Sequence, residues 1–395
     1  MRYLGNKKRL LGKIERCARG LGLRRGTVCD LFAGTAVVGR HFRARGSRVL
    51  STDLMECSYL FQKVFLECCG PPRFSRLASE IDLPPPAPRA RLREEALDGA
   101  DWTPALRVVA WLEERIEPRE GILTRQYTPR GAAMRRYFTP ETAMRLDAIL
   151  AELRAWRRHG LISELEAAFL LCAAIDAADR LANISGTYGA YIKTWQANAL
   201  GEVELRLPAL VDGPPGEAHR EDALEWIGGV EADLLYIDPP YNSRQYPANY
   251  HLLEVIARIP GEPDLDVFEA SIYGKTGLIP WREKASPLCS QRGNRCRDAF
   301  HAILRATRIP RLVISYNEEG IISRDEFEEM LAEYAGVPRS RLGRVLVEIP
   351  YRRFRSDADG RLSRAGAVRN YQQLPGRGRD EVCEWLFHVA RGSGR

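Results

Sequence analysis

The sequence predicts an α/β protein with a Rossmann-like, mostly parallel sheet, one late antiparallel strand and a helical insertion. Three observations predict this class. Short apolar strands alternate with helices over residues 1–66, a helical stretch bordered by prolines follows, and the strand pattern returns after residue 216. Parallel strands need crossover connections, usually helices, so this alternation is typical of a parallel sheet.

The first elements follow from the spacing of apolar residues. Helical spacing occurs over residues 6–20 and 37–44, and short apolar strands cover residues 27–32 and 48–52. The first strand ends in a glycine-containing turn, and Asp53 closes the second.

Proline-rich borders mark the insertion. Six prolines fall within residues 70–98, which we predict to be a linker without regular elements. Helices are predicted over residues 139–157, where Thr139 before Pro140 is a capping signature, and over 163–182. Residues 1–69 and 216–395 are then the two parts of one α/β domain, with residues 70–215 inserted between them.

The second part of the α/β domain repeats the pattern of the first. Ser323 and Glu326 form a capping box that opens a helix ending at Tyr334. The other predicted elements are a strand at 233–237, a helix at 250–258, a strand at 311–316 and a late antiparallel pair at 345–349 and 384–389.

Composition excludes several classes of protein. With 45% hydrophobic and 28% charged residues, the chain is not disordered along its whole length. It has no apolar run of the ~18 residues that a membrane span needs, and its first residues lack a secretory signal, so we expect a cytoplasmic location. The nine cysteines and six histidines show no metal-ligand spacing, and no metal site is expected.

Positive charge is concentrated in two segments. The net charge is +7, and nine basic residues face a single acid within the first 25 positions. Residues 339–379 contain eleven arginines against three acids, a surplus of eight that exceeds the charge of the whole chain. A single arginine is most often part of a solvated surface, but a loop this basic favours a phosphate partner.

A first candidate site is the turn Asp30-Leu31-Phe32-Ala33-Gly34-Thr35-Ala36, which follows a strand and precedes a helix. Backbone N–H groups in such a turn can face a ligand, and an acid that ends the next strand, here Asp53, commonly binds a ribose diol. A purely structural strand–turn–helix unit has the same pattern. The turn has no third glycine and carries Ala36 at a common glycine position, which disfavours NAD and FAD.

A second candidate site is Asp238-Pro239-Pro240-Tyr241, directly after the apolar strand residues 234–237. Prolines remove backbone donors, so carbonyl and carboxylate acceptors are left beside an aromatic ring. This set suits a planar base with an exocyclic NH2, which donates two hydrogen bonds while its ring stacks. A proline pair can also simply end a strand, but we consider that interpretation much weaker here.

The order of these motifs resembles that of the α-group, Dam-type, DNA adenine N6-methyltransferases, most closely the bacterial adenine-specific DNA methylase branch. The branch is marked by residues 242–246 and 249–251, after the catalytic turn. The resemblance implies S-adenosylmethionine as cofactor and Asp238, Pro239, Pro240 and Tyr241 as catalytic residues. It implies cofactor contacts at Tyr3, Lys7, Asp30, Phe32, Ala33, Gly34, Asp53, Leu54, Asp222 and Ala223.

The implied substrate is an adenine flipped out of duplex DNA, because the catalytic groups cannot reach a stacked base. Residues 70–215 would recognise the target sequence. The residues predicted to contact DNA are Lys8, Arg9, Tyr188, Lys193, Arg244, Arg352, Arg353 and Arg355. Tyr188 is equally compatible with a place in the core.

Alternative functions remain open from the sequence alone. Cytosine N4 offers the same amine to the same acceptors, and methylation of RNA or of a protein glutamine uses similar turns. A catalytically silent DNA-binding protein would fit the Ala36 departure, although the turn at Asp238 is intact. The sequence does not give the recognition site, the oligomeric state, or whether a partner restriction endonuclease exists.

Overall fold

The computed structural model describes residues 6–92, 97–343, 345–352 and 381–392. At its centre is a seven-stranded sheet with the order β3-β2-β1-β4-β5-β7-β6, in which β7 alone runs antiparallel to its neighbours. The strands are β1 (Thr27–Asp30), β2 (Arg48–Thr52), β3 (Glu217–His219), β4 (Leu234–Ile237), β5 (Arg311–Asn317), β6 (Leu346–Arg352) and β7 (Glu381–Ala390).

Helices cover both faces of the sheet because successive side chains of a strand point to opposite faces. In β4, Leu234 and Tyr236 join a core with the first three helices, whereas Leu235 and Ile237 pack against the later ones. One face carries α1 (Leu11–Gly20), α2 (Val37–Ala44) and α3 (Glu56–Glu67), and the other carries α9 (Ala223–Trp226), α13 (Arg295–Ala306) and α14 (Arg324–Ala335).

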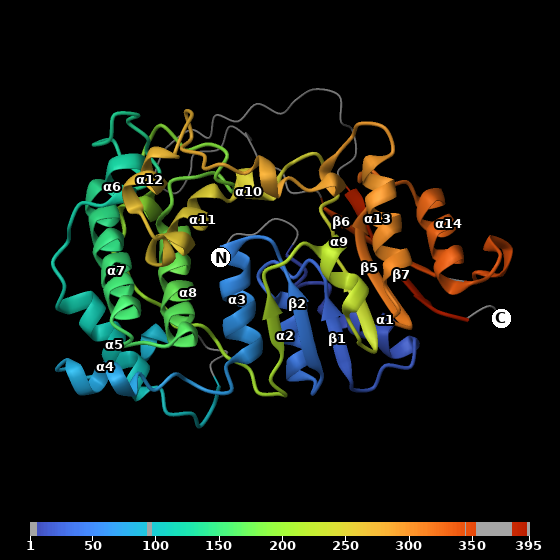
Figure 1. Cartoon of the computed structure of the whole chain (residues 1–395), viewed down its shortest axis with the longest axis horizontal. Coiled ribbons are helices and arrows are strands. Elements are labelled where there is room, and N and C mark those ends of the chain that lie inside the picture. Colours follow the sequence, from blue (N-terminus) through green and yellow to red (C-terminus); the bar gives the residue numbers. More distant parts are fainter. Residues whose placement is uncertain (1–5, 93–96, 344, 353–380, 393–395) are drawn as a thin grey trace.

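A helical part lies beside the β3 end of the sheet (Figure 1). Its core also takes in buried residues of α3, so the two parts share a continuous apolar interior. The helices are α4 (Ser75–Glu80), α5 (Thr103–Glu114), α6 (Ile122–Tyr127), α7 (Pro140–Arg158), α8 (Glu164–Leu181), α10 (Tyr246–Asn249), α11 (His251–Arg258) and α12 (Leu265–Ala270).

Arg43 of α2 joins two segments by hydrogen bonds: the end of α3, where the chain leaves the sheet, and the segment before β3, where it returns. Its buried guanidinium donates to the carbonyls of Phe65 (2.8 Å) and Cys68 (2.7 Å), and at 3.5 Å to that of Gly213. A buried guanidinium needs such acceptors, because an unpaired buried charge is costly. The insertion is therefore joined to the sheet at a fixed place.

The structure confirms the predicted fold class, including the single antiparallel strand. The helix caps are also as predicted: Thr139 accepts the N–H of Thr142, and Ser323 and Glu326 form a capping box. The sequence analysis missed β3, whose three residues lack an apolar pattern. No helix among the described residues has the length and apolar character that crossing a membrane requires.

The prediction of an unstructured linker over residues 70–98 is wrong. The segment contains α4, and Phe74 and Leu77 are completely buried in the core of the helical part. The prolines at both ends of this segment stop regular structure locally but leave room for one short helix between them. That helix forms because its apolar residues have a surface to pack against.

Candidate active site

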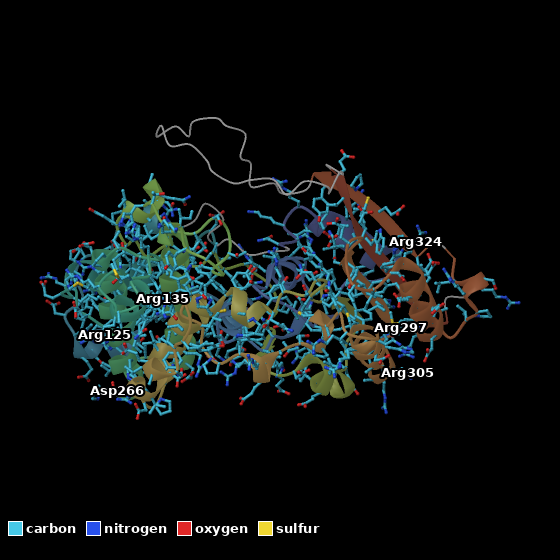
Figure 2. The ribbon with its side chains drawn as sticks, turned by 90° about the horizontal axis from the view of Figure 1, so that it is seen from above. Arg125, Arg135, Asp266, Arg297, Arg305 and Arg324 are labelled. Atoms are coloured by element: carbon cyan, nitrogen blue, oxygen red, sulfur yellow. The ribbon has the colours of Figure 1, made fainter. Side chains whose placement is uncertain are left out.

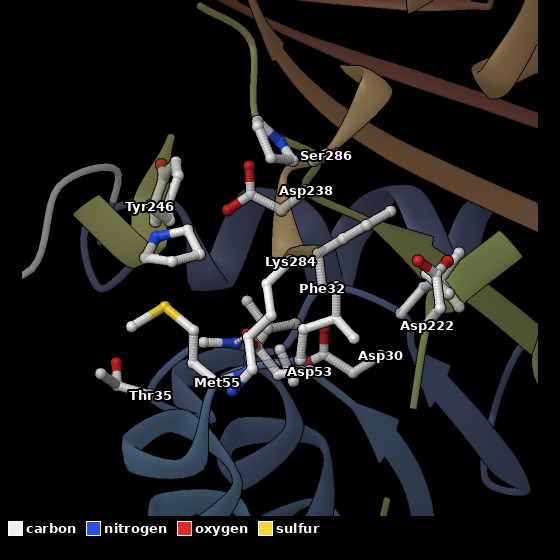
Figure 3. Close-up of a pocket in the computed structure, with 18 of the residues that line it drawn as sticks. Asp30, Phe32, Thr35, Asp53, Met55, Asp222, Asp238, Tyr246, Lys284 and Ser286 are labelled. Atoms are coloured by element: carbon white, nitrogen blue, oxygen red, sulfur yellow. Dashed lines mark hydrogen bonds between the residues drawn. The ribbon is translucent and has the colours of Figure 1, made fainter. Parts of the chain in front are cut away.

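The carboxyl ends of β1, β2 and β4 meet at one edge of the sheet, and a cavity of about 1030 Å³, its open mouth included, lies there. Open α/β sheets bind ligands at this edge. Figure 3 shows Asp30, Asp53 and Asp238 around the cavity, each just at or beyond the end of a different strand. The sequence-predicted residues in its wall are Lys7, Asp30, Phe32, Ala33, Gly34, Asp53, Leu54, Asp222, Ala223, Asp238 and Pro240.

The turn after β1 wraps one end of the cavity. Ala36 at the start of α2 has a left-handed backbone with φ of 58°, a conformation that favours glycine. The alanine therefore keeps the turn that a glycine would make, at some cost in strain. Asp30 Oδ2 accepts the N–H of Gly39 at 3.0 Å, whereas its buried Oδ1 has no hydrogen-bond partner among the described residues.

Asp53 is held by backbone donors on both sides. Its Oδ2 accepts the N–H of Gly34 at 3.1 Å, and its Oδ1 accepts the N–H of Met55 at 3.0 Å. These contacts tie the turn after β1 to the end of β2 and fix the carboxylate at the cavity wall. Asp222 is at the start of α9, where its side chain accepts the N–H of Leu224, and it lines the cavity from the β3 side.

The turn after β4 places Asp238 and Pro240 in the cavity wall, with Pro239 buried behind them. Tyr241 is half-buried, and its ring meets Tyr316 of β5 edge-on at 6.3 Å between centroids. Its carbonyl accepts the N–H of Ile321, so the turn is anchored to the loop after β5.

A buried ion network holds Asp238. Lys7 Nζ lies 3.0 Å from Asp238 Oδ1 and 2.6 Å from Glu384 Oε1 of β7. Burial alone would lower the pKa of Lys7, but these two carboxylates raise it above its ordinary value, so the lysine is charged. Lys7, predicted as a cofactor contact, therefore also connects the N-terminal segment to the Asp238 turn.

Three carboxyl groups of the cavity, those of Asp30, Asp53 and Asp238, have raised pKa values. Burial, together with Glu384, raises the pKa of Asp238 to about 7 although Lys7 opposes the shift. Burial and the neighbouring Asp238 raise the pKa of Asp30 to about 8, and burial raises that of Asp53 to about 6. Desolvated carboxylates with too few cations around them favour a positively charged ligand.

The remaining wall comes from residues that the sequence analysis did not assign to the site. The side-chain amide of Gln245 accepts the N–H of Ser286 and donates to the Ser286 carbonyl. Both residues line the cavity. Lys284 extends over the cavity, its Nζ 3.1 Å from the buried carboxylate of Glu254 on α11 (Figure 3).

Some of these residues gave a signal in the sequence. Gln245 and Tyr246 closely follow the turn at Asp238, and Glu384 is the one acid in the strand predicted at 384–389. Nothing in the sequence marked Lys284 or Ser286, which lie more than forty residues beyond Asp238.

The residues predicted to contact DNA have different environments. Lys8, Arg9, Lys193 and Arg244 are exposed. Tyr188 does not fit the prediction: its ring is completely buried and its hydroxyl donates to Asp179, so it belongs to the core. Arg352 ends β6, and Tyr3, Arg353, Arg355 and most of the basic loop 339–379 lie outside the described residues. Groups of three or more metal-binding side chains are absent from the described part of the chain.

Comparison with known proteins decides the family. The model of the D12 class N6 adenine-specific DNA methyltransferases matches residues 3–83 and 111–263, which include both strand turns of the cavity. The chain belongs to this family. The match confirms the resemblance drawn from the motif order, and it favours adenine N6 in DNA over cytosine N4, RNA, a protein amide or a silent binding protein.

Curated relatives match along most of the chain. Type II methyltransferase M.NlaIII of Neisseria lactamica is 30% identical over 95% of this chain and 98% of its own length. Type II methyltransferase M.FokI of Planomicrobium okeanokoites is 35% identical, and modification methylase StsI of Streptococcus sanguinis 31%, each over 90% of this chain. The chain spans about half the length of these last two relatives. No solved structure matches the chain.

Proposed function

We propose that this chain transfers a methyl group from S-adenosylmethionine to N6 of an adenine flipped out of a specific duplex DNA sequence. The observation that carries the proposal is the single cavity that contains both Asp53, at the end of β2, and Asp238, in the turn after β4. A cofactor bound along the ends of β1–β3 would thus lie directly beside the groups that bind an amine.

The cavity suits this cofactor by its charge. S-adenosylmethionine supplies an electrophilic methyl group on a positively charged sulfonium, and it also carries an ammonium group. The wall contains five acids against two lysines, and Asp30 has a buried oxygen with no partner among the described residues. Asp53 would bind the ribose diol and Asp222 would lie near the cofactor's adenine, as their positions after β2 and β3 suggest.

The turn after β4 would activate the amine. The N6 lone pair is delocalised into the purine ring, which makes the amine a weak nucleophile. Hydrogen bonds donated by NH2 to Asp238 and to the Pro239 carbonyl favour a tetrahedral nitrogen with its lone pair directed at the methyl group, and Tyr241 stacks on the ring. Lys7 contacts Oδ1 of Asp238, so we assign Oδ2 to the amine.

The reaction forms a C–N bond, breaks the C–S bond and releases one proton from nitrogen. With a pKa raised to about 7, Asp238 can accept this proton and return it to water. Flipping the base costs a few kcal/mol of stacking, which phosphate contacts from the exposed basic residues would offset.

The test is methylation of unmodified DNA by the purified chain with S-adenosylmethionine. We expect N6-methyladenine in the hydrolysed nucleosides, and modification-aware sequencing should place it in one sequence context. Detection of N4-methylcytosine, or of no methylated base, would contradict the proposal. Catalytically inactive Asp238→Ala protein is the matched control.

The named relatives also suggest a partner. M.NlaIII and M.FokI are called Type II methyltransferases, so we infer that this chain protects cytoplasmic DNA against an endonuclease that cuts the same sequence. A plasmid methylated by the chain should then resist that endonuclease, whereas an unmethylated plasmid should be cut.

A further inference from the structure

A tight hairpin between α12 and the cavity wall has an unusual anchorage. Tyr273 and Leu278 form an isolated antiparallel bridge in which each N–H donates to the other carbonyl at 2.8 Å. Gly274 and Gly277, with φ of 73° and 76°, make the left-handed corners that the reversal needs. The whole turn is only six residues long.

Four consecutive carbonyls of this hairpin point inward to side chains of the helical part. The contacting side chains are buried, and one of them, Arg135, lies in the helical part (Figure 2). The contacts are Arg135 Nη2 to Gly274 O (2.8 Å), Arg135 Nε to Lys275 O (3.2 Å), His251 Nε2 to Thr276 O (2.9 Å) and Tyr127 Oη to Gly277 O (2.6 Å). Because four consecutive carbonyls have side-chain partners, these contacts hold the hairpin in one backbone conformation.

The side chains at the tip consequently face solvent. Tyr273 is 44% exposed, which places it among the few exposed large hydrophobic residues of the described chain, and Lys275 is exposed as well. An aromatic ring and a cation on a rigid turn lose little conformational entropy on binding, which favours a role in recognition.

A second loop, residues 184–196, is held by contacts that involve the same side chains, Tyr127 and His251. The ring of Tyr137 contacts Tyr127, His251 and also Tyr191. The buried amide of Asn183 donates to the carbonyls of Arg136, Ile192 and Thr194 and accepts the N–H of Gln196. The aromatic cluster of Tyr127, Tyr137, Tyr191 and His251 therefore holds both the hairpin and the loop at 184–196. Lys193 is exposed in that loop.

The hairpin is also connected to the mouth of the cavity. His251 begins α11, which closely follows the catalytic turn and α10 (Figure 1). In the other direction the chain reaches Lys284 and Ser286, both in the cavity wall, soon after Leu278. Short chain segments thus connect the hairpin to two parts of the cavity wall.

We propose that the hairpin 273–278 reads base edges of the target sequence in the major groove, with Lys275 and Tyr273 as the contacting residues. The inference rests on the proposed function. A six-residue turn with glycine corners is narrow enough to enter a groove about 12 Å wide, and a lysine there donates to guanine O6 and N7. Tyr273 would pack against the neighbouring base.

The test compares Lys275→Gln and Tyr273→Ala with Arg308→Gln in the full-length chain. Arg308 is exposed just before β5, at the opposite edge of the sheet, so its substitution removes one charge without touching this surface. Each protein methylates unmodified genomic DNA and a duplex with the wild-type target sequence. Melting temperature and calorimetric affinity for S-adenosylmethionine show that each variant is folded with an intact cofactor site.

We expect Lys275→Gln to lower kcat/KM on the target duplex roughly five- to hundredfold and to relax one position of the sequence context. Tyr273→Ala should relax an adjacent position, and Arg308→Gln should stay within about twofold of wild type. An unchanged context and rate in both hairpin variants, with their folding intact, would overturn the inference while leaving the methyltransferase activity standing. A wild-type chain without DNA methylation would overturn both.

Discussion

Replacing Glu384 with glutamine tests whether the buried ion network tunes Asp238. The substitution keeps the size of the side chain but removes one of the two carboxylates that contact Lys7. Burial and Glu384 both raise the pKa of Asp238, so loss of the Glu384 charge should lower it. In the proposed mechanism Asp238 accepts the amine as a carboxylate, so we expect activity to be lost as the pH falls through its pKa.

The size of the effect follows from the geometry. Asp238 Oδ1 and Glu384 Oε1 lie 3.0 Å and 2.6 Å from the same nitrogen, so they are at most 3.0 + 2.6, or about 5.6 Å, apart. Two unit charges at that distance repel by about 0.7 kcal/mol in water and about 3 kcal/mol at an effective dielectric constant of 20. At 1.36 kcal/mol per pKa unit, this is about half a unit to two units.

The assay is the initial rate of DNA methylation at low substrate across the neutral pH range, since kcat/KM reports groups of the free enzyme. In the wild type the acidic limb should lie near the pKa of about 7. Glu384→Gln should move this limb to lower pH by about one unit. The control is Glu348→Gln on the adjacent strand β6, which removes an exposed carboxylate and should leave the limb in place. If the acidic limb of the pH profile lies at the same pH in Glu384→Gln and Glu348→Gln, the reasoning is refuted.

Three further changes test other parts of the site. Asp238→Ala should abolish methyl transfer while DNA affinity in a gel-shift assay stays within a few-fold, and retained methylation would remove Asp238 from the mechanism. Asp53→Asn should weaken S-adenosylmethionine binding roughly tenfold or more by calorimetry, because a charged acceptor is lost, and unchanged affinity would place the ribose elsewhere. Ala36→Gly should relieve the left-handed strain and raise the free energy of unfolding by up to about 1 kcal/mol in a denaturant titration, and a lower value would show that the alanine methyl contributes more through packing.

The two turns of the site were recognisable in the sequence because each is a continuous segment with its own chemistry. Asp30–Gly34 and Asp238–Tyr241 both follow apolar strands, and parallel strands bring their carboxyl ends to one edge. The positions of these residues around one cavity therefore needed no knowledge of the helical part. Tyr188 shows the limit of this reasoning, because an aromatic residue in a glycine-rich segment has the same appearance whether it stacks on a base or fills a core.

The sequence by itself determined the strand–helix alternation, the helix caps and the two turns, since all of them depend on residues close together in the chain. Only the tertiary structure decided that Glu384, near the end of the described chain, shares Lys7 with Asp238, and that Lys284 covers the cavity. It likewise decided that Arg135, Tyr127 and His251 hold one hairpin. The contacts of Lys7, Arg135 and Tyr127 join residues more than a hundred positions apart, and only the packing of the sheet and the helical part brings them together.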